Sequence, residues 1–179
     1  MVAQLYDTCP YSPGVVHERL RPARVLARAG VPFVVWGEDA LAFAHWVDTG
    51  LFDFHVLVPD SDVNAAVEAL MDGLPCRRSA PPHRWIEYKM WDPSESPCFP
   101  NARWLQMESR LSVEEAENIV VHPESSFSFS VRDSTLSRPL KTTALPEDAN
   151  ILFPTLPALL NSLTAVSYTH LTLPTNREV

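Results

Sequence analysis

Two runs of sequence decide the fold of this chain: VPFVVWGEDALAFAHW at residues 31–46 and LFDFHVLV at residues 51–58. In the first run, the apolar residues that end at Trp36 are β-branched or aromatic, which predicts a short buried strand. Residues 37–46 predict a helix whose first turn carries two acidic residues. This placement is favourable because a helix dipole is positive at its N-terminal end.

The second run is the clearest strand in the sequence. Because side chains alternate along a strand, we expect Leu51, Asp53, His55 and Leu57 on one face and Phe52, Phe54, Val56 and Val58 on the other. The aromatic face is expected to be buried against helices. Residues 60–71 predict an amphipathic helix with Asp60 or Ser61 as its N-cap. Strand and helix thus alternate, which predicts an α+β fold with helices packed on a mixed β-sheet.

The remaining sequence predicts weaker elements around this centre. An extended arm is expected over residues 1–15, and a basic helix over 17–29 is expected to stop at Gly30. A short helix over 112–118 is predicted from the capping-box pair Ser112 and Glu115. Further strands are expected over 85–90, 103–107, 119–121 and 151–153, the last leading into a helix over 154–163.

Composition places the chain among ordinary globular domains. It has 179 residues and a formal net charge of −8, with 14 basic against 22 acidic side chains. Negative charge opposes binding to polyanions, so we expect no nucleic-acid partner and no association with a membrane surface. The three cysteines form no Cys-x-x-Cys pair, and the N-terminus has no signal-peptide pattern. We therefore expect reduced thiols and a cytoplasmic location.

The C-terminal segment differs in character from the rest. Residues 166–175 (VSYTHLTLPT) are similar to the translation of a transposon-end adaptor used in sequencing libraries, with ten consecutive matches. A Thr-rich natural tail is the alternative. We expect residues 166–179 to be a non-native tail without core contacts, and the domain over 16–165 to be incomplete at its C-terminus.

Residues 31–71 resemble the start of the nucleotidyltransferase fold. In that superfamily a strand runs into a glycine loop and a helix, and the next strand carries Asp-x-Asp followed by apolar residues. The wording VWGEDAL at 35–41 and DFHVLVPD at 53–60 is also similar to a group of fungal nucleotidyltransferase-like proteins. The resemblance implies that Asp53 and His55 occupy the catalytic positions. It also implies that Gly37, Glu38 and Asp39 occupy the positions of the nucleotide-binding loop.

Two departures from the family pattern predict a degenerate site. His55 stands where the second carboxylate belongs, and imidazole is a poor ligand for Mg²⁺, which prefers oxygen donors. Glu38 stands where a small residue would let phosphate approach the backbone, and its charge would repel a triphosphate. Glu87 or Glu108 is a candidate for the third carboxylate, and nothing in the sequence selects either.

Structural interpretations stand beside these functional ones. Asp53 and His55 also fit a local hydrogen-bonded pair, and Glu38 and Asp39 also fit simple helix N-terminal acids. The scattered tryptophans suit core packing better than base stacking. Two weaker features are a set of zinc-ligating types, Cys76, His83 and Cys98, and a basic cluster best interpreted as a solvated loop, Arg77, Arg78, His83 and Arg84.

The sequence therefore favours a nucleotidyltransferase-like protein with a degenerate metal site, which binds a protein partner or a small-molecule ligand without catalysis and needs no cofactor. The alternative is an active nucleotidyltransferase acting on a small acceptor. In that case Asp53 would bind Mg²⁺, and His55 would serve as a substitute ligand or a general base.

Overall fold

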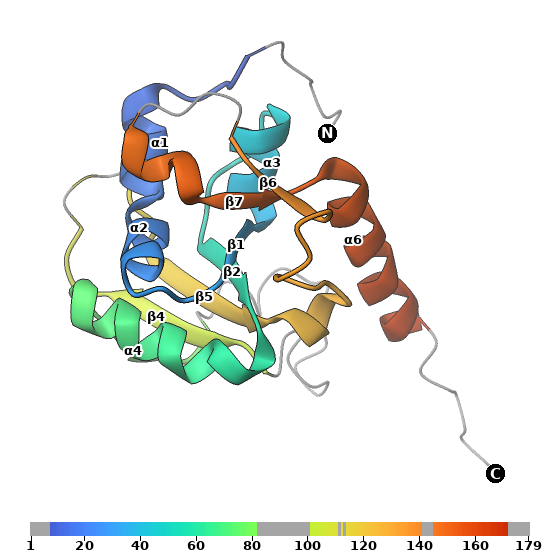
Figure 1. Ribbon diagram of the computed structural model, residues 1–179. Helices are drawn as coiled ribbons and strands as arrows, with labels where there is room; N and C mark the ends of the chain where they lie inside the picture. Colours follow the sequence, from blue (N-terminus) through green and yellow to red (C-terminus); the bar gives the residue numbers. More distant parts are fainter. Residues whose placement is uncertain (1–7, 82–100, 111, 113, 141–144, 172–179) are drawn as a thin grey trace.

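The computed structural model describes residues 8–81, 101–110, 112, 114–140 and 145–171, with 165–171 as backbone only. Within these residues the fold is α+β, as expected, with a mixed sheet of five strands and a two-stranded ribbon (Figure 1). The strand order in the main sheet is β1-β2-β5-β4-β3. Its strands are β1 (Val34–Trp36), β2 (Phe54–Val58), β3 (Cys76–Ser79), β4 (Arg103–Met107) and β5 (Asn118–Pro123).

The centre of the sheet joins segments that are far apart in the sequence. β2 runs parallel to β5, with Phe54 opposite Ile119, and antiparallel to β1, with Trp36 opposite His55. The strand pairs β5–β4 and β4–β3 are antiparallel. The end of β1 and the starts of β2 and β5 therefore meet at one edge of the sheet, which carries the candidate site.

The predicted basic helix over 17–29 is two helices, α1 (Pro13–Arg19) and α2 (Arg21–Arg28). Pro22 explains the break, because it has no N–H to continue the hydrogen-bond ladder from α1 and lies in the first turn of α2, where a missing N–H is tolerated. α1 begins inside the predicted arm, where the hydroxyl of Ser12 accepts a hydrogen bond from the backbone N–H of Val15. Residues 1–7 of that arm lie outside the described residues.

The two helices predicted around β2 are present. α3 (Gly37–His45) ends at Trp46, which has left-handed backbone geometry. The next segment consists of a 3-10 turn, η1 (Asp60–Asp62), and then α4 (Val63–Gly73). α4 buries the predicted apolar face of Val63, Ala66, Val67 and Leu70.

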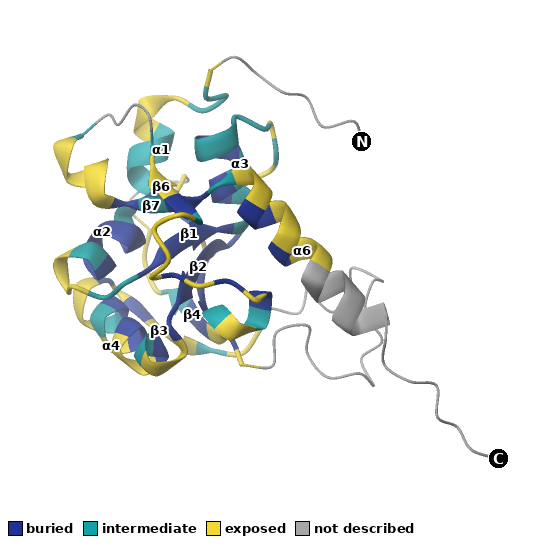
Figure 2. Ribbon diagram, turned by 45° about the vertical axis from the view of Figure 1, so that its right-hand side comes forward, coloured by how far each residue is buried: buried dark blue, intermediate teal, exposed yellow. Residues whose placement is uncertain are grey.

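The two faces of the sheet belong to separate apolar clusters. Phe54, Val56 and Val58 pack in the larger cluster, together with residues of α2, α3 and α4. Leu57 points the other way and packs with Trp36, Phe127 and Leu159. Figures 1 and 2 show α1, α2 and α4 on one side of the sheet and α6 (Leu156–Leu171) on the other.

The predicted alternation is confirmed within β2 and wrong just before it. Phe52 is 54% exposed, and Leu51 packs against the larger cluster instead of the opposite one. The physical reason is that the regular strand begins at Phe54. Leu51 and Phe52 precede it and do not follow its pleat.

Two further expectations about elements are wrong. Residues 112–118 form no helix in their described part, and Asn118 already belongs to β5. The Ser112 hydroxyl instead accepts a bond from the backbone N–H of Glu114, two residues on, which is a turn contact in place of a helix cap. Arg77 and Arg78 lie on β3, not in a loop, because antiparallel pairing with β4 satisfies their backbone groups.

The C-terminal part of the described chain forms a ribbon and a helix. The 3-10 turns η2 (Glu124–Phe127) and η3 (Pro146–Asn150) flank β6 (Ser137–Pro139), which pairs with β7 (Leu152–Pro154) before α6 begins. The backbone of α6 continues through residues 166–171, and 172–179 lie outside the described residues, as does the predicted strand over 85–90. The absence of core contacts in this tail stays a prediction.

Candidate functional site

The site lies on one face of the sheet, at the edge where β1 ends and where β2 and β5 begin. The pairing of Phe54 with Ile119, continued by one residue, brings Asp53 opposite Asn118. His55 is two residues further along β2, and His122 lies on the neighbouring strand β5. The topology thus brings together two pairs of polar side chains, Asp53 with Asn118 and His55 with His122, whose members are 65 and 67 residues apart in the sequence.

Asp53 is fully buried and is held by an amide. Its Oδ1 accepts a hydrogen bond from Nδ2 of Asn118 over 2.8 Å, and neither side chain is more than 3% exposed. A buried carboxylate requires such a partner, because an unsatisfied charge away from water is costly. Asp53 therefore serves as part of the internal hydrogen-bond network and does not present its carboxylate to solvent.

His55 and His122 form a buried imidazole pair. Nδ1 of His55 lies 2.9 Å from Nε2 of His122, and the two rings are nearly parallel, with an angle of 13° between their planes. Burial lowers the pKa of His55 to about 4, and burial together with the neighbouring His55 lowers the pKa of His122 well below its usual 6.5. Both rings are thus neutral near pH 7, and one nitrogen of the pair must donate its proton to the other.

Gly37 and Glu38 cover His55 from the start of α3. Gly37 has a φ of +67°, and a Cβ added to it would lie 3.4–3.5 Å from atoms of the His55 side chain. Glycine is therefore favoured by its backbone geometry, whereas an added Cβ would make only ordinary contact with the imidazole. The Glu38 Oε2 atom lies 3.9 Å from Nε2 of His55. Burial raises the pKa of Glu38, with smaller contributions from Asp39 and Asp53.

Asp39 points into the interior and pairs with Arg19. Nε of Arg19 donates to Oδ1 of Asp39 over 2.8 Å, and Nη2 donates to Oδ2 over 2.6 Å. The same guanidinium donates from Nη1 to the carbonyl of Phe52 over 2.9 Å. Asp39 thus joins α3 to α1 and to the segment before β2, and its carboxylate is not directed at a ligand. This geometry does not favour the predicted role of Asp39 in cofactor binding.

The donor set does not fit Mg²⁺. Asp53 is enclosed and already bonded to Asn118, and His55 offers nitrogen in place of the oxygen that Mg²⁺ prefers. Glu108, a candidate third carboxylate, is exposed beyond the end of β4, and Glu87 lies outside the described residues. Among the described residues, no group of three or more His, Cys, Asp or Glu side chains is arranged to hold a metal ion.

Of the three residues of the weaker zinc pattern, Cys76 is among the described residues. Cys76 is buried at the start of β3, and its thiol donates to the carbonyl of Leu70. Burial raises the pKa of this thiol to about 11, so Cys76 is a neutral core residue. His83 and Cys98 lie outside the described residues.

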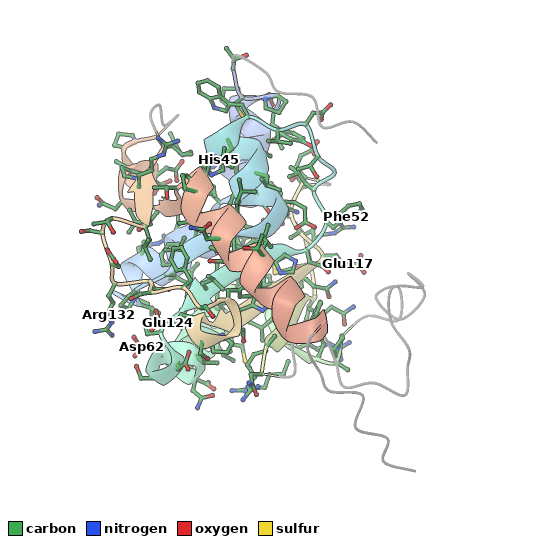
Figure 3. The ribbon with its side chains drawn as sticks, turned by 90° about the vertical axis from the view of Figure 1, so that its right-hand side faces the viewer. His45, Phe52, Asp62, Glu117, Glu124 and Arg132 are labelled. Atoms are coloured by element: carbon green, nitrogen blue, oxygen red, sulfur yellow. The ribbon has the colours of Figure 1, made fainter. Side chains whose placement is uncertain are left out.

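A cavity of about 340 Å³ opens at the same edge as Asp53 and Asn118. Its walls come from α1, from the segment before β2 and from the loop before β5, with these lining residues: Tyr11, Val15, Arg19, Leu51, Phe52, Arg110, Glu114, Glu115 and Glu117. Figure 3 shows Phe52 and Glu117 close together on this side of the molecule.

Sequence reasoning missed the partners of the predicted site residues. Asn118, His122 and Arg19 become visible only through the parallel pairing of β2 with β5 and the packing of α1 on α3. One signal was available for His122 and Asn118, since they are polar residues at either end of the apolar run 119–121. Polar residues at the ends of a buried strand indicate that the strand edge carries polar chemistry.

Comparison with protein-family models, with curated proteins and with solved structures finds no match for this chain. None of the helices in the described part of the chain has the length and apolar character that crossing a membrane would require.

Proposed function

We propose that this chain is a nucleotidyltransferase-like protein that has lost its metal site and acts by binding a small ligand at the edge of the sheet, without catalysis. The proposal starts from the order of strand, glycine turn, helix and strand over residues 34–58, with Gly37 at the turn and Asp53 before the second strand. The family resemblance indicates where the site lies. The side chains at that position indicate what chemistry it can perform.

One observation carries the proposal: the polar groups at this edge are bonded to one another. Asp53 accepts from Asn118, and His55 is paired with His122. Binding Mg²⁺ and a triphosphate at this edge would require breaking buried hydrogen bonds, each of which is expensive to leave unmade. A second charged oxygen donor beside Asp53 would be needed as well, and Asn118 provides a neutral amide there.

Glu38 does not supply the missing function. Its carboxylate is the one acid of the predicted motif that reaches solvent, with 27% of the side chain exposed, but it lies over His55 at the start of α3. There its negative charge opposes the approach of phosphate to the helix N-terminus.

The alternative of an active transferase assigns His55 the role of general base. A general base works best when its pKa is close to the working pH. Burial holds the pKa of His55 near 4, which makes it a weak acceptor of protons at neutral pH. We therefore favour binding over catalysis.

An assay of pyrophosphate release tests this proposal. Purified chain is incubated with Mg²⁺, each of the four ribonucleoside triphosphates and a panel of small hydroxyl- or amine-bearing acceptors. We expect release no greater than that from a sample without protein. Release that depends on both Mg²⁺ and protein, and that disappears in Asp53→Asn, would contradict the loss of the metal site.

A further inference from the structure

A row of leucines lies on the exposed side of α6. Leu156, Leu160 and Leu163 are 40%, 51% and 41% exposed. Residues three and four positions apart lie on one face of a helix, so the three side chains form a single row. Among the described residues, the one other large apolar side chain with comparable exposure is Phe52. The exposed apolar surface of the described chain is therefore concentrated on α6, and it lies before residue 166, where the expected non-native tail begins.

A different side of α6 holds the helix on the body of the protein. Ala158 and Leu159 are buried in the smaller apolar cluster, together with Trp36. Ser162 is buried on the same side, and its hydroxyl donates to the carbonyl of Ala158 over 2.9 Å. Figure 2 shows the first turns of α6 with buried residues on one side and exposed residues on the other. The leucine row is thus not used to attach α6 to its own chain.

The sequence around the leucine row carries no charged side chain. Between residues 149 and 176 there is no Asp, Glu, Lys or Arg. The rest of the chain has an excess of acidic residues, and its net charge of −8 makes two copies repel each other at most orientations. A surface without charged groups avoids close contacts between like charges and has no ion to desolvate. The leucine row is therefore a surface at which a second copy can be accommodated.

The spacing of the leucines also suits contact with an identical row. A two-fold axis brings the same patch of two copies face to face, so the patch must be complementary to itself. If two α6 helices pack antiparallel with the axis beside Leu160, Leu156 of each copy faces Leu163 of the other. Leucines three and four positions apart can interlock between two such helices. From Leu156 to Leu163 the row covers about 10 Å of helix.

We propose that α6 is a dimerisation surface, and that two copies of this chain associate through antiparallel α6 helices packed along Leu156, Leu160 and Leu163. One row of leucines is small beside the interface of a permanent dimer, so the association is reversible. The proposal goes beyond the proposed function and does not depend on it. None of the three leucines lines the cavity or takes part in the two polar pairs of the site.

Sedimentation velocity of the full chain, without metal or nucleotide, tests the association. Over concentrations from about 5 to about 500 µM we expect a reversible change from monomer to dimer, since an interface of this size gives a Kd of about 10–500 µM. Leu160→Glu should weaken dimerisation at least about tenfold, because it places two like charges beside the axis. A chain that stays monomeric throughout, or a dimer that Leu160→Glu leaves unchanged, would overturn the inference.

Asn161→Glu is the matched control for Leu160→Glu. Asn161 is exposed on the same helix and lies about 100° around its axis from Leu160. The control adds the same charge outside the row, so it should weaken dimerisation by less than about threefold. Urea melts at low protein concentration establish that both variants are folded. Equal weakening by the two variants would show that added charge alone is responsible, and would overturn the assignment of the leucine row.

Cysteine crosslinking tests the antiparallel arrangement. Next to the two-fold axis, Leu160→Cys places two thiols within reach of a disulfide, whereas Asn161→Cys directs them away from each other. With oxidised glutathione as the oxidant, we expect a covalent dimer to form at least about tenfold faster from Leu160→Cys than from Asn161→Cys. The native chain, which has three cysteines of its own, gives the background rate. Equal rates for the two variants would overturn the antiparallel pairing.

Discussion

His55 and His122 are two imidazoles that the fold keeps away from water, and their protonation links stability to pH. Both have a pKa below the value of about 6.5 expected in an unfolded chain. Between pH 6.5 and about 4 the unfolded state therefore binds more protons than the folded state. The free energy of unfolding must fall as the pH falls through this range.

The measurement is urea unfolding at several pH values between 7.5 and 4.5, for the native chain and for His122→Gln. Each histidine kept neutral contributes a loss of at most about 1.4 kcal/mol per pH unit. We expect the native chain to lose stability more steeply than the variant, by up to that amount. The raised pKa of Glu38 acts in the opposite direction and is present in both chains. Equal slopes in the two chains would contradict a neutral buried pair.

Arg19 and Asp39 form a second buried contact, both at most 2% exposed. Removing one partner leaves the other charge buried without compensation, so Arg19→Met should cost about 3–5 kcal/mol. Arg19→Met combined with Asp39→Leu should cost less than the sum of the two single changes, because no charge is then left alone. Urea unfolding of the four chains measures this coupling, and additive losses would show that the ion pair is not an interacting unit.

For single residues, the sequence identifies Asp53 and His55 as polar residues of the candidate site, but it does not identify their partners. Both stand out as polar residues within an apolar run, which is a local signal. Asn118 lies 65 positions and His122 lies 67 positions from the residue it contacts, and no local pattern encodes those pairings. The same is true of Arg19, which the sequence places in a predicted basic helix without indicating its partner Asp39.

Among the elements, β2 and the segment before it give the sharpest contrast between neighbouring aromatic residues. Phe54 is fully buried between the sheet and α2, α3 and α4, whereas Phe52 is 54% exposed. Phe54→Ala should therefore cost about 3–5 kcal/mol through lost burial and a residual cavity. Phe52→Ala should change the free energy of unfolding by no more than about 0.5 kcal/mol. Similar losses in urea melts of the two variants would place the start of the strand elsewhere.

Elements with a strong local pattern were predictable, and elements that depend on distant partners were not. The strand 103–107 and the apolar face of α4 follow directly from residue type and spacing. β3 is a strand because it pairs with β4, and its sequence CRRS has no clear strand pattern. The capping box at Ser112 failed as a signal because the Ser112 hydroxyl accepts a turn contact from Glu114 and the chain enters β5 at Asn118, where tertiary pairing overrides local preference.

For the whole molecule, the central proposal is that the site has the position of a nucleotidyltransferase site without its metal chemistry. Asp53 would offer Mg²⁺ one carboxylate, and that group is buried against Asn118. Under the proposed resemblance, His55 and Glu38 stand where the superfamily pattern has the second carboxylate and the small loop residue. Restoring those two residue types should therefore restore some affinity for a metal–nucleotide complex.

The most direct measurement is a calorimetric titration of Mg²⁺-ATP into the native chain and into a variant with His55→Asp and Glu38→Ser, after urea melts confirm that both are folded. We expect no binding by the native chain and measurable, Mg²⁺-dependent binding by the variant. Tight Mg²⁺-dependent binding by the native chain would contradict the account, because it would mean that Asp53 and its neighbours still form a working metal–nucleotide site.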